Sequence, residues 1–69
     1  MTNSTIKTLQ ANIRKYRLEK GLTQEKLSEM CEVTTDYISY IERGIRTPTM
    51  KRFTMIAEAL GVEPYKFFQ

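Results

Sequence analysis

Apolar residues recur at intervals of three and four along most of the chain, which is the spacing of a helix with one buried face. In residues 6–20 this apolar stripe consists of Leu9, Ile13 and Tyr16. In residues 50–60 it consists of Phe53, Ile56, Ala57 and Leu60. The strict alternation of apolar and polar residues that is typical of a half-buried strand does not occur. The pattern therefore predicts an all-α protein.

Cap residues indicate where these helices begin and end. Gly21 and Gly61 follow the two apolar stripes and suit the left-handed backbone that ends many helices. Thr49 carries a hydroxyl that can accept a hydrogen bond from a free backbone N–H at the start of the next helix. Pro64 suits the first position of a helix, so a short final helix is expected after Gly61.

The middle of the chain predicts two short helices with almost no loop between them. Thr23 and Thr34 are suitable N-caps, and only Glu32 and Val33 remain for the turn. Apolar residues follow each cap at helical spacing: Leu27, Met30 and Cys31 in the first helix, and Tyr37, Ile38 and Ile41 in the second. Together with the flanking helices, this predicts a bundle of five short helices.

The stretch 23–43 resembles the helix-turn-helix of phage-repressor and Cro-type DNA-binding proteins, and the resemblance extends over residues 6–68. The matching residues are Gly21, Leu22, Thr23, Gln24, Leu27, Ser28, Val33, Thr34, Ile38, Ile41, Glu42, Arg43, Gly44, Arg46, Thr47, Pro48 and Thr49. Ser28 replaces the usual alanine but is still small enough for the two helices to cross closely. Glu32 replaces the usual turn glycine, and a glutamate at positive φ costs roughly 1 kcal/mol. The resemblance implies a lambda-repressor-like domain whose second and third helices form the motif.

This resemblance also implies that the second helix of the motif enters the major groove of double-stranded DNA. Because Ile38 and Ile41 must face the core, the outward residues are Thr35, Asp36, Ser39 and Tyr40. Thr35, Asp36 and Tyr40 lie where family members contact bases. Asp36 can accept a hydrogen bond from a cytosine amino group, or it can simply favour the positive end of the helix. Tyr37 is expected to pack in the core with its hydroxyl near the DNA.

Donors for the DNA phosphates are expected on both sides of that helix. The set consists of Gln24 before it and Arg43, Arg46 and Thr47 after it. Lys51 and Arg52 can add further phosphate contacts or remain solvated.

Three further residue groups have expected roles in structure or assembly. The resemblance implies that Arg17 and Glu42 form a structural ion pair, although they can also be two separate surface charges. Near the C-terminus, Tyr65 and Phe68 are candidates for a homodimer interface, while Phe67 is expected to close the core. For Phe68 a core position is equally open.

The composition limits the other possibilities. The chain has 69 residues, which corresponds to a single domain (residues 1–69), and residues 1–5 are polar and expected to fray, with Thr5 or Thr8 capping the first helix. With one cysteine and no histidine, neither a disulfide nor a structural zinc site is expected, and no cofactor is implied. Cys31 is expected to pack as a small hydrophobe. No apolar run is long enough to span a membrane, and a reducing cytoplasm is the expected location, for a protein of bacterial or phage origin.

The net charge of +3 is mildly basic and agrees with a nucleic-acid partner. The sequence therefore predicts a sequence-specific transcriptional regulator, of the repressor type found in phages, plasmids and mobile elements. Such proteins bind near-palindromic operators as homodimers. The alternatives are an antitoxin or a protein-binding module of the same fold. Enzyme function is not expected, because no nucleophile–base pair or phosphate loop is present, and no domain for a small-molecule ligand is evident.

Overall fold

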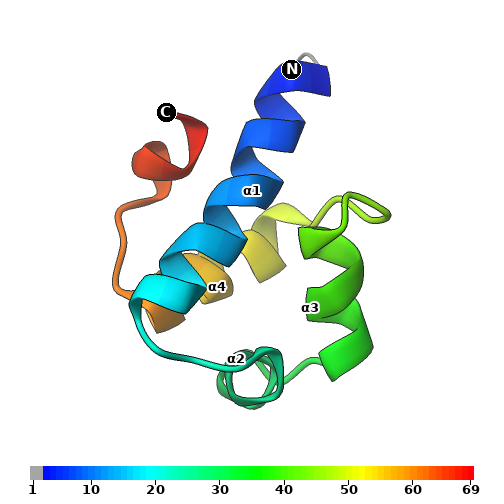
Figure 1. Cartoon of the computed structure of the whole chain (residues 1–69), viewed down its shortest axis with the longest axis vertical. Helices are drawn as coiled ribbons and strands as arrows, with labels where there is room; N and C mark the ends of the chain where they lie inside the picture. Colours follow the sequence, from blue (N-terminus) through cyan, green and yellow to red (C-terminus); the bar gives the residue numbers. More distant parts are fainter. Residues whose placement is uncertain (1–2) are drawn as a thin grey trace.

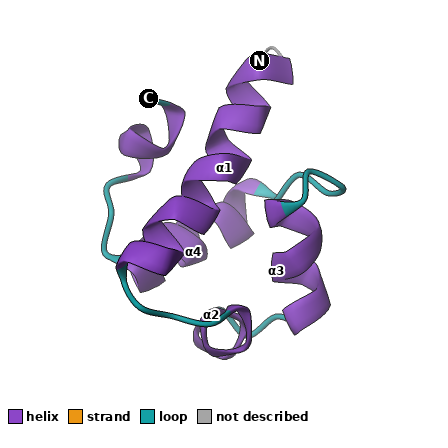
Figure 2. Ribbon diagram, in the orientation of Figure 1, coloured by secondary structure: helices purple, strands orange, loops and turns teal. Residues whose placement is uncertain are grey.

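The computed structural model describes residues 3–69, which form four α-helices and one 3-10 helix (Figure 1). The elements are α1 (Asn3–Glu19), α2 (Gln24–Met30), α3 (Thr35–Glu42), α4 (Met50–Leu60) and the 3-10 helix η1 (Pro64–Phe68). No strand occurs within this part of the chain, as Figure 2 shows. The all-α prediction is confirmed, but the expected fifth α-helix is wrong, because η1 is a 3-10 helix.

The geometry of η1 follows from its length and its attachment to α1. Its backbone hydrogen bonds join residues three apart, with Lys66 N–H donating to the Glu63 carbonyl at 3.0 Å. The side-chain amide of Asn12 in α1 donates to the Phe67 carbonyl at 2.8 Å and to the Gln69 carbonyl at 3.2 Å. Asn12 supplies the hydrogen-bond donors for these two carbonyls, so they need none from a further helical turn. The five residues of η1 therefore suffice to bring the chain back against α1.

Helix α1 begins earlier than the sequence predicts. It starts at Asn3 rather than at residue 6, so Thr5 and Thr8 lie within the helix and neither is its N-cap. Residues 3–5 lie within α1, and residues 1–2 lie outside the described part, so the expected fraying of residues 1–5 stays a prediction. Polarity alone does not end a helix, and no glycine or proline interrupts this segment.

The other three α-helices begin where their threonine caps predict. Each threonine hydroxyl accepts a hydrogen bond from the backbone N–H three residues later, at 3.0–3.2 Å: Thr23 from Lys26, Thr34 from Tyr37, and Thr49 from Arg52. A side-chain cap of this kind stabilises a helix by about 1 kcal/mol. The starts of α2, α3 and α4 are therefore fixed by local chemistry.

One apolar core joins all the elements, and α1 crosses in front of α4 in Figure 1. Its buried members are Leu9, Ile13, Leu27, Cys31, Ile38, Ile41, Phe53, Ile56, Ala57, Leu60 and Phe67. The Phe67 ring is fully buried and makes edge-to-face contacts with Tyr16 and Phe53, at centroid distances of 5.1 and 5.2 Å. The expected core positions of Phe67 and Cys31 are confirmed.

The turn between α2 and α3 has the strained residue that the sequence predicts. Glu32 has a φ of 56°, in the left-handed region that glycine usually occupies. On the inner face of α2, Ser28 is buried and its hydroxyl donates to the Glu25 carbonyl at 2.6 Å. The small serine therefore lets the helices approach and also satisfies its own polar group.

Candidate nucleic-acid interface

Helix α3 has one buried and one outward face. Ile38 and Ile41 are fully buried, whereas Thr35, Asp36 and Tyr40 are exposed. Ser39, which its spacing places with the same outward group, is half-buried. Packing of the two isoleucines against α1 and α2 therefore fixes the rotation of α3 and leaves its N-terminal half open to a partner.

The Thr35 hydroxyl is already partly engaged inside the protein. It lies 3.2 Å from the Ser28 hydroxyl oxygen. Because Ser28 donates its proton to the Glu25 carbonyl, Thr35 is the donor in this contact. Thr35 is left with acceptor lone pairs and a methyl group to present outward. It can therefore accept from a base amino group or contact a thymine methyl, but it has no second proton to donate.

The loop after α3 carries the cationic residues that flank its outward face. Arg43, Arg46 and Thr47 are all exposed, and the loop lies at the far end of α3 in Figure 1. The Arg46 guanidinium lies over the ring of Tyr37, 5.3 Å from the ring centroid. Tyr37 is half-buried, which agrees with its expected packing. A cation–π contact of this kind restrains Arg46 close to the start of α3.

Gln10 anchors this loop, and the sequence analysis did not identify it. Its side-chain amide donates to the Arg46 carbonyl at 2.9 Å, although the two residues are 36 positions apart. The side chain is buried, and the Arg46 N–H donates to the Tyr40 carbonyl at 3.2 Å. Gln10 follows Leu9 in α1, at the edge of the apolar stripe. A polar residue at such a position was the signal in the sequence, but the apolar pattern alone does not say which group that residue binds.

At the C-terminal end of α3, Glu42 forms a polar network with Arg17 and Gln24. The Arg17 Nε donates to the Glu42 Oε2 at 2.7 Å, and its Nη2 donates to Oε1 at 3.0 Å. Arg17 Nη1 also donates to the Leu22 carbonyl at 2.8 Å. The Gln24 amide donates to Glu42 Oε1 at 3.1 Å. Since an amide nitrogen has two protons, Gln24 keeps one for an outside acceptor and is held at the start of α2.

Burial raises the pKa of the Cys31 thiol, and the positive charge of Arg52 acts in the opposite direction.

Among the described residues, no group of three or more cysteine or acidic side chains could hold a metal ion. No helix in residues 3–69 has the length and apolarity needed to cross a membrane.

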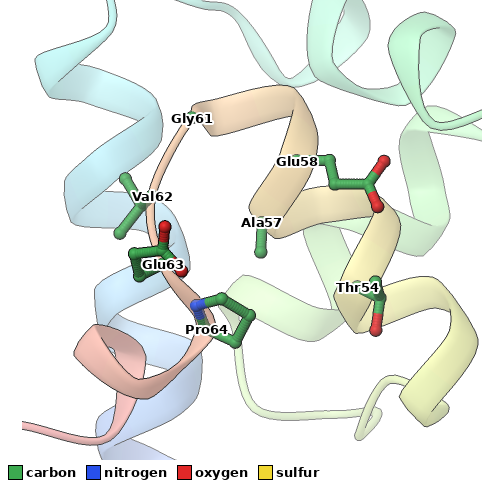
Figure 3. A pocket seen from close by; sticks show the side chains of 7 residues that line it. All are labelled: Thr54, Ala57, Glu58, Gly61, Val62, Glu63 and Pro64. Carbon is green, nitrogen blue, oxygen red and sulfur yellow. The ribbon is translucent and has the colours of Figure 1, made fainter.

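A surface hollow lies at the end of α4, and two carboxylates are among the side chains that line it (Figure 3). It has a volume of about 390 Å³, and its lining includes Ala57, Val62 and Pro64 together with two carboxylates, Glu58 and Glu63. None of its lining residues comes from α3. Its charge is unsuited to a phosphate, so it does not extend the nucleic-acid interface.

The two residues expected at a dimer interface are accessible. Tyr65 is 59% exposed and Phe68 is 38% exposed. The Phe68 ring also contacts Phe53 edge to face, at a centroid distance of 5.7 Å. One side of Phe68 therefore closes the core, and the other side is open at the surface.

The geometry of α2 and α3, which are joined by a tight turn and followed by an exposed cationic loop, is that of a helix-turn-helix protein. The helix-turn-helix family model matches residues 13–67, and the chain belongs to this family, in its Cro and C1-type form. It is a DNA-binding transcriptional regulator.

Control protein C.BamHI from Bacillus amyloliquefaciens is 40% identical to this chain over 65 residues, covering 93% of this chain and 80% of that protein. The restriction-modification controller protein C.AhdI from Aeromonas hydrophila has a crystal structure that matches with a TM-score of 0.86 at 30% identity, covering 91% of this chain and 96% of that one. The wild-type controller protein C.Esp1396I matches with a TM-score of 0.85 at 37% identity, covering 99% and 88% of the two chains.

Proposed function

We propose that this protein binds a near-palindromic operator as a homodimer and regulates transcription from it, in the manner of repressors of mobile genetic elements. The observation that carries the proposal is the exposed face of α3, which has hydrogen-bond donors from two other elements near it. Arg43, Arg46 and Thr47 lie on the loop after α3, and Gln24 lies at the start of α2, where it contacts the last residue of α3. Donors beside a reading helix match the phosphates that border a major groove.

Within this proposal, the bases are read by the outward face of α3. Thr35, Asp36, Ser39 and Tyr40 supply the contacts. Asp36 accepts from a cytosine amino group, while Thr35 offers its methyl group or a free lone pair. The Tyr40 hydroxyl can donate or accept, and the half-buried Ser39 reaches only a close neighbour. This set distinguishes bases by acceptors and methyl contacts more than by arginine donors.

The phosphate contacts fix the position of α3 in the groove. Arg43 and Arg46 supply positive charge, Thr47 supplies a hydroxyl, and Gln24 supplies its remaining amide proton. The Arg17–Glu42 pair has a supporting role, because it orients Gln24 and joins α1 to the end of α3. Neutralising phosphates releases counterions, so binding to any DNA should weaken as salt rises.

Dimer formation is proposed because a single reading helix covers only a few base pairs. Tyr65 and Phe68 supply exposed aromatic surface for contact with a second copy. A small domain also gains stability when it associates, because a larger fraction of its apolar surface is then buried. The match to a control protein and to a restriction-modification controller protein supports a regulator of this kind.

The experiment that tests this function is selection of bound sequences from random duplex DNA. The expected result is an enriched site with two related halves whose centres lie about 10 base pairs apart, or a multiple of that. Sedimentation should give two chains per duplex. Enrichment of a single unrepeated site would contradict the dimer, and no enrichment at all would contradict sequence-specific binding.

A further inference from the structure

A hollow with an excess of positive charge lies between α3 and α4, beside the proposed interface. It has a volume of about 410 Å³, and we refer to it as the α3–α4 hollow. Its polar lining comes from the turn before α3, from the start of each helix and from the loop between them: Glu32, Thr34, Tyr37, Arg46, Thr49 and Arg52. We propose that the α3–α4 hollow seats one phosphate of the DNA backbone, held between Arg46 and Arg52. This seat extends the DNA-binding function proposed above and rests on it.

Arg52 carries the inference because it is partly buried but has no counter-charge. Among residues 3–69, no carboxylate oxygen lies within 4.0 Å of its guanidinium, and its side chain makes no hydrogen bond. Arg17 differs, because it has a structural role and each of its three guanidinium nitrogens donates to the Glu42 carboxylate or to the Leu22 carbonyl. Withdrawing a charge from water without a partner is unfavourable, so Arg52 gains more from an incoming anion than a fully solvated cation does.

The threonines of the hollow add donors of the right kind. The hydroxyl oxygens of Thr34 and Thr49 accept N–H groups of their own helices as caps. Each hydroxyl therefore keeps its proton for an outside acceptor. Two guanidinium groups and two hydroxyl protons offer only donors, which fits a ligand that has only acceptor oxygens, such as a phosphodiester.

The position of Arg46 connects the hollow with the DNA face of α3. Its guanidinium lies over the Tyr37 ring, and both residues line the hollow. Glu32 also lines it, but this side chain is exposed and forms no ion pair with either arginine. The two arginines leave an excess of one positive charge around the hollow. A phosphate bound there would lie next to the start of α3. It would be a different phosphate from those bound by Arg43 and Thr47, which do not line the hollow.

The test compares the neutral variant Arg52→Gln with Lys51→Gln. Both remove one positive charge from the first turn of α4, but Lys51 is exposed and does not line the hollow. Arg52→Gln should weaken binding to the selected operator and to a random duplex alike, by about tenfold or more. The log–log salt slope should become shallower by about 2 for a dimer, with base preference unchanged. Lys51→Gln should change both quantities much less, and Arg52→Lys should restore the slope more than the affinity.

Three results would overturn the proposal. Equal effects of Arg52→Gln and Lys51→Gln would mean that only general charge matters, and an unchanged affinity for Arg52→Gln would mean that no phosphate binds there. If inorganic phosphate alone shifted the amide NMR signals of residues 49–52 while Arg52→Gln left DNA binding intact, the hollow would be a site for free phosphate. A different result would contradict the DNA-binding function proposed above: Arg43→Ala and Thr35→Ala would then leave DNA binding unchanged as well. Thermal unfolding of each variant checks that it is folded.

Discussion

Arg17 in α1 and Glu42 at the end of α3 form a two-point ion pair, with Nε–Oε2 and Nη2–Oε1 distances of 2.7 and 3.0 Å. Their side chains are only 8% and 2% exposed. This pair fastens the reading helix to the scaffold, because Glu42 is the last residue of α3 and also binds Gln24. The geometry makes Arg17 a structural residue that acts on DNA only through α3.

Removing one partner of this pair should destabilise the fold strongly. Glu42→Ala leaves Arg17 buried without a counter-charge, and we expect the free energy of unfolding to fall by about 3–5 kcal/mol. Such a loss is a large part of the stability of a small domain. Chemical denaturation followed by circular dichroism measures it. The control is Glu29→Ala, which breaks an exposed 3.8 Å pair with Lys26 and should change stability by less than about 1 kcal/mol. Similar losses in both variants would contradict a buried structural role.

Gln10 is expected to affect DNA binding without touching DNA. Gln10→Leu removes the hydrogen bond to the Arg46 carbonyl and frees the loop that carries Arg43 and Arg46. We expect a loss of about 1 kcal/mol in stability, together with a several-fold weaker affinity that is alike for all sequences. Gel-shift titration and thermal unfolding measure the two effects. Thr54→Ala is the control, because the exposed Thr54 hydroxyl donates to the Met50 carbonyl within α4 and does not contact the loop. It should change stability little and leave the affinity unchanged.

Local chemistry determined which parts of this fold could be predicted from the sequence. The caps at Thr23, Thr34 and Thr49 each depend on a backbone N–H three residues away, so a single sequence contains the necessary information. The 3-10 geometry of η1 depends instead on Asn12, 55 residues earlier. Contacts of that kind leave no local pattern.

The candidate site divides in the same way. The outward face of α3 follows from the spacing of Ile38 and Ile41, which are both buried. The role of Gln10 and the engagement of the Thr35 hydroxyl by Ser28 require the three-dimensional structure. The first contact joins α1 to the loop after α3, and the second joins α2 to α3.

Thr35 should affect base preference rather than general affinity. Because its hydroxyl donates to Ser28, the methyl group is the main feature that it presents outward. Thr35→Ser keeps the hydroxyl and removes the methyl, so a preference for thymine at one position of each half-site should weaken by about 1 kcal/mol or more. Repeating the selection from random DNA with this variant measures the change. The control Arg43→Ala should weaken all sequences alike and make the salt slope shallower. A Thr35→Ser variant that selects the same bases as the native protein would show that this methyl group reads nothing.

Cys31 should make the stability of the fold depend on pH in the alkaline range. Burial raises the pKa of its thiol in the folded state, so the folded protein holds this proton more tightly than the unfolded chain does. The resulting stabilisation is complete below the ordinary thiol pKa of about 8.5 and is lost as the pH rises from there through the raised value. Denaturation at several pH values between about 7.5 and 10 measures the decline. Cys31→Ala is less stable throughout because of the cavity that it leaves, but it lacks this titration, so its stability should fall less steeply. Parallel curves for the two proteins would mean that the thiol has the same pKa in the folded and unfolded states.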